Sequence, residues 1–337
     1  MTIRKSFFSL FIIFVFSSCS NQADYKKIIG STMGTSYSII AKVTDQDIQL
    51  IHQTIEAELE DINQLMSTYV PNSEINQFNN LKEDSCFKFS EKTWQVLLAS
   101  KQIYEETEGA FDITLGPLIS RWGFSAEEYQ QQVPNEAEIK ALLAVVGTDK
   151  LDFNTQAQCV TKSIPSMSIN LSAIAKGYAV DQLAKILEEN NIQDYLVEIG
   201  GEVKAKGLKQ NRLNWKIAVE KPSNNVNRNQ SVVVNLFNIS IATSGDYRNY
   251  YEVDGKRFSH TIDPTSGFPV KHNLTSISVL HPSNMYADAY ATALNVLGQE
   301  KAYAFAEQHN LAIYTITQQS DTPKTRSNNR FDAYISR

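Results

Sequence analysis

The segment from 283 to 298 carries a carboxylate and a hydroxyl at a spacing that suits a metal ion. It begins with Ser283, a residue type that caps helix N-termini, and it stops at Gly298. Asp288 and Thr292 are four residues apart, so both oxygens leave the same face of the expected helix. One carboxylate and one hydroxyl suit Mg²⁺, which keeps waters and takes further ligands from substrate phosphates. A solvated helix face would show the same spacing, so the pair alone leaves both interpretations open.

A second polar group lies in "NLSAIAKGYAVD", at 170–181, where we expect a strand to pass into a helix. Backbone amides at the start of a helix can hold a phosphate, and the ammonium of Lys176 would add a point charge. Asn170 is a further hydrogen-bonding group. Gly177, within the first turns, can equally serve only the close packing of this helix.

A third group places Asp112 on a loop after a helix, close to Phe111, Trp122 and Phe124. Aromatic rings beside a carboxylate suit a flat heterocycle with donor edges, such as an isoalloxazine or an adenine. Burial of the same rings in the protein core is the alternative.

The stretch "RFSHTIDPTSGFPV", at 257–270, combines an imidazole, a carboxylate and turn-forming residues. His260 and Asp263 could belong to a hydrolase triad, a metal site, a phosphate site or a well-formed turn. No G-x-S-x-G is present, and Ser244 in "ATSGD" lacks the first glycine of a nucleophile elbow. The hydrolase interpretation therefore has the least support.

The elements that must position these groups indicate an α+β fold. Apolar residues recur at three- and four-residue steps from 48 to 66, which predicts an amphipathic helix. Further helices are expected after Ser90, from a capping box at Asn135, and over 172–189. Strands are expected at 37–43, 195–199, 215–219, 232–241, 275–280 and 312–317. The order is too irregular for a doubly wound fold, and no G-x-G-x-x-G follows a strand, so a Rossmann nucleotide site is not supported.

The N-terminus predicts export. A basic start and an apolar run of about ten residues indicate a signal peptide over 1–18, too short to span a bilayer of about 30 Å. "FSSC", ending at Cys19, resembles the lipobox of bacterial lipoproteins, although an ordinary cleavage site beside an incidental cysteine is the alternative. We expect a lipidated Cys19, a spacer over 19–27 and one functional domain over 28–337. The mature chain would be anchored to a bacterial membrane, facing the periplasm.

Composition excludes other classes of partner. The formal net charge of −6 becomes about −8 without 1–18, and no basic stripe remains to attract nucleic acid. After Cys19, only Cys86 and Cys159 are left, without Cys/His metal spacing. An exported compartment permits a disulfide between them but does not establish one.

Eight short motifs, taken in order, resemble the ApbE family of flavin transferases over nearly the whole mature chain. The motifs are "MGT" at 33, "STY" at 67, "GAFDITLGPL" at 109, "AIAKGYAVD" at 173, "EIGGEVKAKG" at 198, "ATSGDYRNYY" at 242, "SHTIDPTSGFP" at 259 and "ADAYATAL" at 287. The resemblance implies a single-chain α+β structure with a T-fold-like core of mixed sheets and packed helices.

The resemblance also implies an activity. Such a protein takes FAD and, with Mg²⁺, moves the FMN part onto a threonine or serine hydroxyl of a partner protein, releasing AMP. Typical acceptors are subunits of the Na⁺-pumping NADH:quinone oxidoreductase (Nqr), of the related Rnf complex, and other exported flavoproteins.

Site residues follow from the same resemblance. It assigns Asp288 and Thr292 as magnesium ligands, joined by the backbone carbonyl of Ala173 and by Ala291. The positions that would line the FAD site are Met33, Tyr69, Ala110, Phe111, Asp112, Asn170, Lys176 and Ile262. Two positions depart from the family pattern, because Asn170 stands where Asp is common and Thr261 where Ile is usual. At Asn170, a charged contact would therefore be neutral.

His260 is the expected catalytic residue. A threonine hydroxyl is a poor nucleophile at neutral pH, and a histidine titrates in the range where a base is useful. We predict His260 as the base or as a phosphate contact, with Asp263 and Pro264 setting the turn that aims it.

Two alternatives stay open at this point. With water in place of the acceptor hydroxyl, the same site would be a periplasmic FAD pyrophosphatase giving FMN and AMP. A non-catalytic flavin-binding lipoprotein would need neither Asp288 nor Thr292.

Overall fold

The computed structural model describes residues 23–82, 84–125, 133–219, 232–245, 250–253, 255–319 and 322–336. The predicted signal peptide and Cys19 lie outside these residues. Among the described helices, none combines the length and the apolar character that a bilayer crossing requires.

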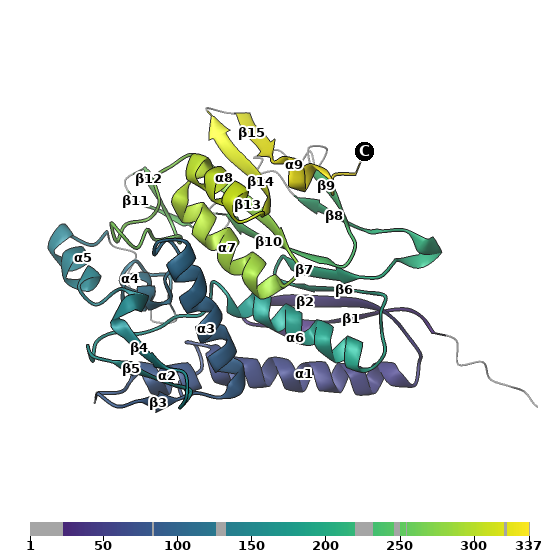
Figure 1. Cartoon of the computed structure of the whole chain (residues 1–337), viewed down its shortest axis with the longest axis horizontal. Coiled ribbons are helices and arrows are strands. Elements are labelled where there is room, and N and C mark those ends of the chain that lie inside the picture. Colours follow the sequence, from purple (N-terminus) through teal and green to yellow (C-terminus); the bar gives the residue numbers. More distant parts are fainter. Residues whose placement is uncertain are drawn as a thin grey trace, which may run out of the picture.

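An eight-stranded antiparallel sheet forms the centre of the molecule (Figure 1). Its strands, in spatial order, are β1 (Asp24–Thr32), β2 (Thr35–Val43), β6 (Tyr195–Ile199), β7 (Glu202–Lys206), β10 (Ile239–Gly245), β13 (Leu274–His281), β14 (Ala312–Gln319) and β15 (Thr322–Ser327). Alternate side chains of β2 are buried, as the period of a strand requires. Together with the helices that pack on it, this sheet confirms the expected mixed α+β architecture.

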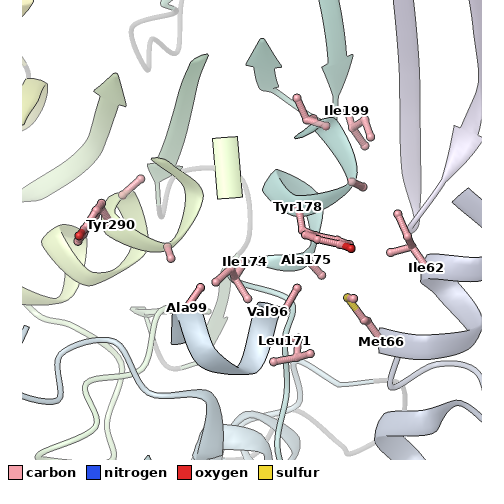
Figure 2. Packing of buried hydrophobic residues seen from close by; sticks show 14 of the residues in the cluster. Ile62, Met66, Val96, Ala99, Leu171, Ile174, Ala175, Tyr178, Ile199 and Tyr290 are labelled. Carbon is pink, nitrogen blue, oxygen red and sulfur yellow. The ribbon is translucent and has the colours of Figure 1, made fainter. Parts of the chain in front are cut away.

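Five helices accompany this sheet: α1 (Asp47–Met66), α3 (Glu91–Glu106), α6 (Ala175–Glu189), α7 (Asn284–Leu297) and α8 (Gln299–Gln308). The largest hydrophobic core lies between these helices and one face of the sheet. The predicted apolar stripe of α1 is buried, and Figure 2 shows Tyr178 of α6 beside Ile62 and Met66 of α1. Each fully buried side chain of this size contributes about 1.5–3 kcal/mol, so the stripe fixes α1 against α6.

A second, smaller core covers the opposite face of the sheet. It is formed with β8 (Trp215–Val219), β9 (Val232–Leu236) and α9 (Asn329–Asp332), and its largest side chain is the buried Trp215.

The remaining elements between α1 and α6 form a lobe that shares the largest hydrophobic core, at the lower left of Figure 1. Its elements are α2 (Glu74–Asn79), β3 (Phe87–Lys88), α4 (Gly116–Arg121), α5 (Glu136–Leu143), β4 (Leu151–Asn154), β5 (Cys159–Lys162) and the short 3-10 turns η1 (Ile113–Leu115) and η2 (Thr148–Lys150). A disulfide joins Cys86 to Cys159 here, which answers the question that the sequence left open.

Three predicted boundaries are corrected by the structure. The run 232–241 is two strands in different sheets, because Asn238 takes a left-handed conformation (φ 52°) that asparagine tolerates better than most residues. The spacer expected to reach 27 ends earlier, since β1 begins at Asp24. The first β1 residues are polar because this is an edge strand with exposed side chains. The helix expected from 172 begins at Ala175, after a turn.

Candidate functional site

Several of the predicted motifs meet at one end of the main sheet. The turn between β1 and β2, at 32–35, touches the turn between β6 and β7, where the N–H of Gly200 donates to the carbonyl of Ser36 at 3.1 Å. The antiparallel register places the end of β10, at 243–245, on the same side. We call these three segments, with the start of α6, the site end of the sheet.

The start of α6 and the second turn of α7 are in direct contact at the site end. The backbone N–H of Gly177 donates to Oδ2 of Asp288 at 3.0 Å. A Cβ at residue 177 would lie 2.4 Å from the carbonyl oxygen of Asn284, so only glycine permits this approach. The packing interpretation of Gly177 is therefore correct, and the packing brings a buried carboxylate to the start of α6.

This contact frees a backbone carbonyl. In a continuous helix, the N–H of residue 177 would donate to the carbonyl of residue 173. Because the N–H of Gly177 is directed to Asp288, the carbonyl of Ala173 accepts no hydrogen bond from any described residue. The Thr292 hydroxyl also makes none within the described chain, whereas Thr54 donates to the carbonyl one turn before it.

The oxygens of Asp288, Ala173 and Thr292 form a set that fits a hard cation. Mg²⁺ prefers one or two carboxylate oxygens, neutral oxygens and waters. Ala291 is buried in α7 and could offer only its carbonyl, which inside a helix points to the N–H of Asn295. Asp288 therefore offers a charged oxygen, and Ala173 and Thr292 offer oxygens without a hydrogen-bond partner in the described chain. The prediction for Ala291 has less support.

Lys176 lies between two buried carboxylates. Its Nζ is 2.5 Å from Oε1 of Glu202 and 3.8 Å from Oδ2 of Asp288. Burial alone would lower the pKa of Lys176, but the charges of Asp288 and Glu202 outweigh it and raise that pKa above its usual value. Lys176 is thus held as a cation next to the predicted magnesium ligand.

Glu202 was not among the predicted site residues. Burial raises the pKa of Glu202 to about 7 against the attraction of Lys176, and Oε2 has no hydrogen-bond partner among the described residues. Burial likewise raises the pKa of Asp288, opposed by Lys176 and by the N–H of Gly177. The sequence signal for Glu202 was its place directly after the Gly-Gly turn in "EIGGE", which fixes the start of β7 at the site end.

The predicted aromatic platform around Asp112 is not formed. Phe111 and Trp122 are buried in two different hydrophobic cores, so the core interpretation is correct for both rings. Oδ1 of Asp112 accepts hydrogen bonds from the N–H and hydroxyl of Thr114 and from the hydroxyl of Thr148. Contacts of this segment with a flavin therefore stay predictions, and for Phe111 they would involve the backbone.

Asn170 connects that segment to the turn before α6. Its backbone N–H donates to the carbonyl of Ile113 at 2.7 Å, and its Oδ1 accepts from the N–H of Ser172 at 2.9 Å. A neutral amide is sufficient for the second bond, so the departure from Asp leaves the turn before α6 intact.

Met33 and Tyr69 lie beside the C-terminal end of α1. Met33 occupies the β1–β2 turn with a positive φ of 49°, and the adjacent Thr32 accepts a hydrogen bond from Nδ2 of Asn63. Tyr69 follows α1 and is 67% exposed, an unusual exposure for a tyrosine. Its ring is available for stacking, and its place at a flavin stays a prediction.

His260 directly follows β12 (Lys256–Ser259), which pairs with β11 (Tyr250–Val253), and its ring lies edge-on to Phe124. The carboxylate of Asp263 accepts from the N–H of Thr265 and the hydroxyl of Ser266, which makes Asp263 a turn former, as expected.

The loop that carries His260 is packed at both of its ends. Ile262 is buried in the Trp122 core, and the Trp122 indole donates to the carbonyl of Gly267. The loop then reaches the end of α7, where Nε2 of His272 is 2.6 Å from the carbonyl oxygen of Asn295. Asp288 lies seven residues earlier, about 10 Å along the helix axis.

The chain is similar to known proteins over most of its length. The model of the ApbE family matches residues 33–315. The FAD:protein FMN transferase of Haemophilus influenzae is 40% identical, over 94% of this chain and 93% of that protein. The one of Vibrio cholerae is 37% identical, over 99% and 100%.

Solved structures show the same fold. The flavin transferase ApbE from Vibrio cholerae aligns with a TM-score of 0.85 at 37% identity, over 93% of this chain and 99% of that chain. The ApbE protein from Thermotoga maritima aligns with a TM-score of 0.83 at 26% identity, over 93% and 100%.

Proposed function

This chain belongs to the ApbE family and is an FAD:protein FMN transferase, and we propose the reaction and the residues by which it acts. The FMN part of FAD is transferred to a threonine or serine hydroxyl of an acceptor protein. The hydroxyl oxygen forms a bond to the phosphorus of the FMN half, the bridging P–O bond breaks, and AMP leaves. The hydroxyl proton passes to a base on the enzyme.

One observation carries the proposed metal dependence. The N–H of Gly177 is directed to Asp288, and within the described part of the chain this leaves the carbonyl of Ala173 without a donor. With the hydroxyl of Thr292, these oxygens would hold Mg²⁺. Bound there, the ion would neutralise negative charge on the pyrophosphate oxygens.

Lys176 is proposed to orient the pyrophosphate from the start of α6. Its ammonium is fixed by Glu202 at 2.5 Å, so it is positioned before the substrate arrives. Anions are favoured at this place because the first N–H groups of a helix carry partial positive charge.

His260 is proposed as the base or as a phosphate contact. The backbone is paired on either side of the imidazole, at Ser259 with Tyr250 and at Ile262 with Pro269. We also propose that the remaining predicted residues contact FAD. They are Met33, Tyr69, Ala110, Phe111, Asp112, Asn170 and Ile262.

The acceptor is proposed to be an exported flavoprotein subunit, of the Nqr or Rnf kind or another class. Lipidation of Cys19 would hold the enzyme at the membrane where such subunits lie. The disulfide between Cys86 and Cys159 supports an oxidising, exported location. Mass spectrometry of the mature N-terminus, with Cys19→Ala as control, tests the anchor.

Incubation of the pure protein with FAD, Mg²⁺ and a candidate acceptor tests the activity. Flavin fluorescence that stays on the denatured acceptor, with an equal amount of AMP, is the expected result. Free FMN with AMP would instead show hydrolysis, and FAD binding without AMP and without sensitivity to EDTA would show a carrier.

A further inference from the structure

Strand β1 connects the two ends of the main sheet. It runs from Asp24 to the turn at 32–35, and nine residues of an antiparallel strand extend about 27 Å. Only residues 20–23 separate the proposed lipid on Cys19 from Asp24, a reach of at most about 18 Å. The end of the sheet that contains Asp24 would therefore stay near the membrane, and the site end would lie on the far side.

We define the tether end as the start of β1, the loop 207–213 and the turn 237–238. The start of β1 holds the loop, because the hydroxyl of Tyr25 donates to the carbonyl of Leu208 at 2.6 Å. The turn joins them, since Oδ1 of Asn238 accepts from the N–H of Gly207 at 3.0 Å. Figure 1 shows the small helical turn of this loop at the right of the molecule, on the side where β1 begins.

Two large apolar side chains are exposed together at the tether end. Leu213 is 58% exposed and Phe237 is 51% exposed. The β8–β9 register pairs Trp215 with Leu236, so Leu213 and Phe237 both lie just beyond the same end of this strand pair. Large apolar side chains that are exposed at one end of a molecule are typical of a surface that contacts a partner or a membrane.

Cations lie on the same loop as Leu213, where the N–H of Lys209 donates to the carbonyl of Leu213 at 2.7 Å. Lys42, Lys209 and Arg212 are exposed and line a hollow of about 420 Å³ at the start of β1. Two carboxylates also line it, Asp24 and Asp194, and one oxygen of Asp194 already accepts from the N–H of Leu208. The hollow thus has an excess of positive charge in a chain whose formal net charge is −6.

We propose that the tether end is a membrane-contact surface for anionic phospholipids. Leu213 and Phe237 enter the headgroup region, and Lys42, Lys209 and Arg212 bind the headgroup phosphates. The inference rests on the proposed lipid on Cys19. Together, the lipid and this contact turn the site end away from the bilayer. Acceptor segments that project from the membrane would then reach the site end without passing beneath the enzyme.

Vesicle binding tests the proposal. A chain that starts at Ser20 contains every described residue of the fold and lacks the lipid. It should bind vesicles of phosphatidylcholine with phosphatidylglycerol more tightly than vesicles of phosphatidylcholine alone, and added salt should weaken that binding. Lys209→Glu with Arg212→Glu should weaken it roughly tenfold or more. Leu213→Ser with Phe237→Ser should weaken binding to both kinds of vesicle.

Matched variants on other faces serve as controls. Lys140→Glu with Lys301→Glu reverses two exposed cations outside the tether end, and Leu98→Ser removes an exposed leucine of α3. These should bind the anionic vesicles like the unmodified chain. Equal affinity for both vesicle types, no binding at all, or an equal loss in the control variants would overturn the proposal. Since no FAD is present, failure of flavin transfer would leave this result unaffected.

Discussion

The N–H of Gly177 and the carboxylate of Asp288 form a 3.0 Å hydrogen bond between the start of α6 and the second turn of α7. This bond takes the place of the helical bond to Ala173 and leaves the carbonyl of Ala173 without a donor among the described residues. One interaction therefore both orients the predicted carboxylate ligand and makes a second ligand available. The glycine is required because a side chain would collide with Asn284.

Asp288→Asn separates the charge of this carboxylate from its structural role. The amide oxygen can still accept from Gly177, so the fold should persist with a change in unfolding temperature of a few degrees at most. The affinity for Mg²⁺ should fall at least about tenfold, because the anionic ligand is lost. AMP release measured against Mg²⁺ concentration checks this. Unchanged Mg²⁺ dependence would contradict the assignment of Asp288 as a ligand.

Glu202→Gln tests whether the charge of Glu202 holds the ammonium of Lys176 away from Asp288. Without the charge of Glu202, the ammonium should move from its 3.8 Å distance towards Asp288 and compete with Mg²⁺. We expect a higher Mg²⁺ requirement, with the maximal rate approached again at high Mg²⁺. Because Mg²⁺ would bind less tightly, adding Mg²⁺ and FAD should raise the unfolding temperature of this variant less than that of the unmodified chain.

The control for this change is Glu105→Gln, which removes an exposed carboxylate paired with Lys101 on α3. It should leave both measurements unchanged, since surface pairs contribute little. If Glu202→Gln only lowers stability and leaves the Mg²⁺ requirement as it was, Glu202 has a structural role alone.

Much of this site could be predicted from the sequence, because its residues lie in local patterns. The helix with Asp288 and Thr292 was visible from its cap and its spacing, and α1 from its apolar period. Glu202 was missed because its place after the Gly-Gly turn does not report that it is buried against Lys176, 26 positions away. The Phe111 and Trp122 rings were ambiguous for a related reason, since core and ligand sites use the same residue types.

His260→Ala tests the proposed base. FAD binding should persist, while transfer to the acceptor should slow by roughly 10²–10⁴ if the imidazole takes the hydroxyl proton. Single-turnover flavinylation with saturating FAD and acceptor separates this step from binding. A variant that binds FAD and transfers FMN at the unmodified rate would show that His260 is not needed for the chemistry.

Cys86→Ser with Cys159→Ser tests the disulfide of the lobe between α1 and α6. The bridge closes a loop of 73 residues, and removing such a crosslink lowers the free energy of unfolding by about 4 kcal/mol in the chain-entropy model. Urea unfolding with and without reductant measures the loss. The double variant should resemble the reduced protein, and equal stability of reduced and oxidised protein would show that the bridge is dispensable.

His281→Asn should make stability less dependent on pH. His281 ends β13, and its Nδ1 accepts from the N–H of Ser283 at the start of α7, a bond that asparagine can replace. Burial lowers the pKa of His281, although Asp181 and Glu106 oppose this and Lys204 adds to it. Below about pH 6.5 the unfolded chain therefore binds more protons than the folded one, and stability falls as the pH falls.

Above that pH, His281 is neutral in both states and contributes no slope. The free energy of unfolding, from urea curves at about pH 7.5 and about pH 5.5, should drop less in His281→Asn than in the unmodified chain. His309→Asn, at the end of α8, is the matched control and should keep the unmodified drop. An equal drop in His281→Asn would mean that other groups cause the acid sensitivity, because the proton taken up on unfolding could not then come from His281.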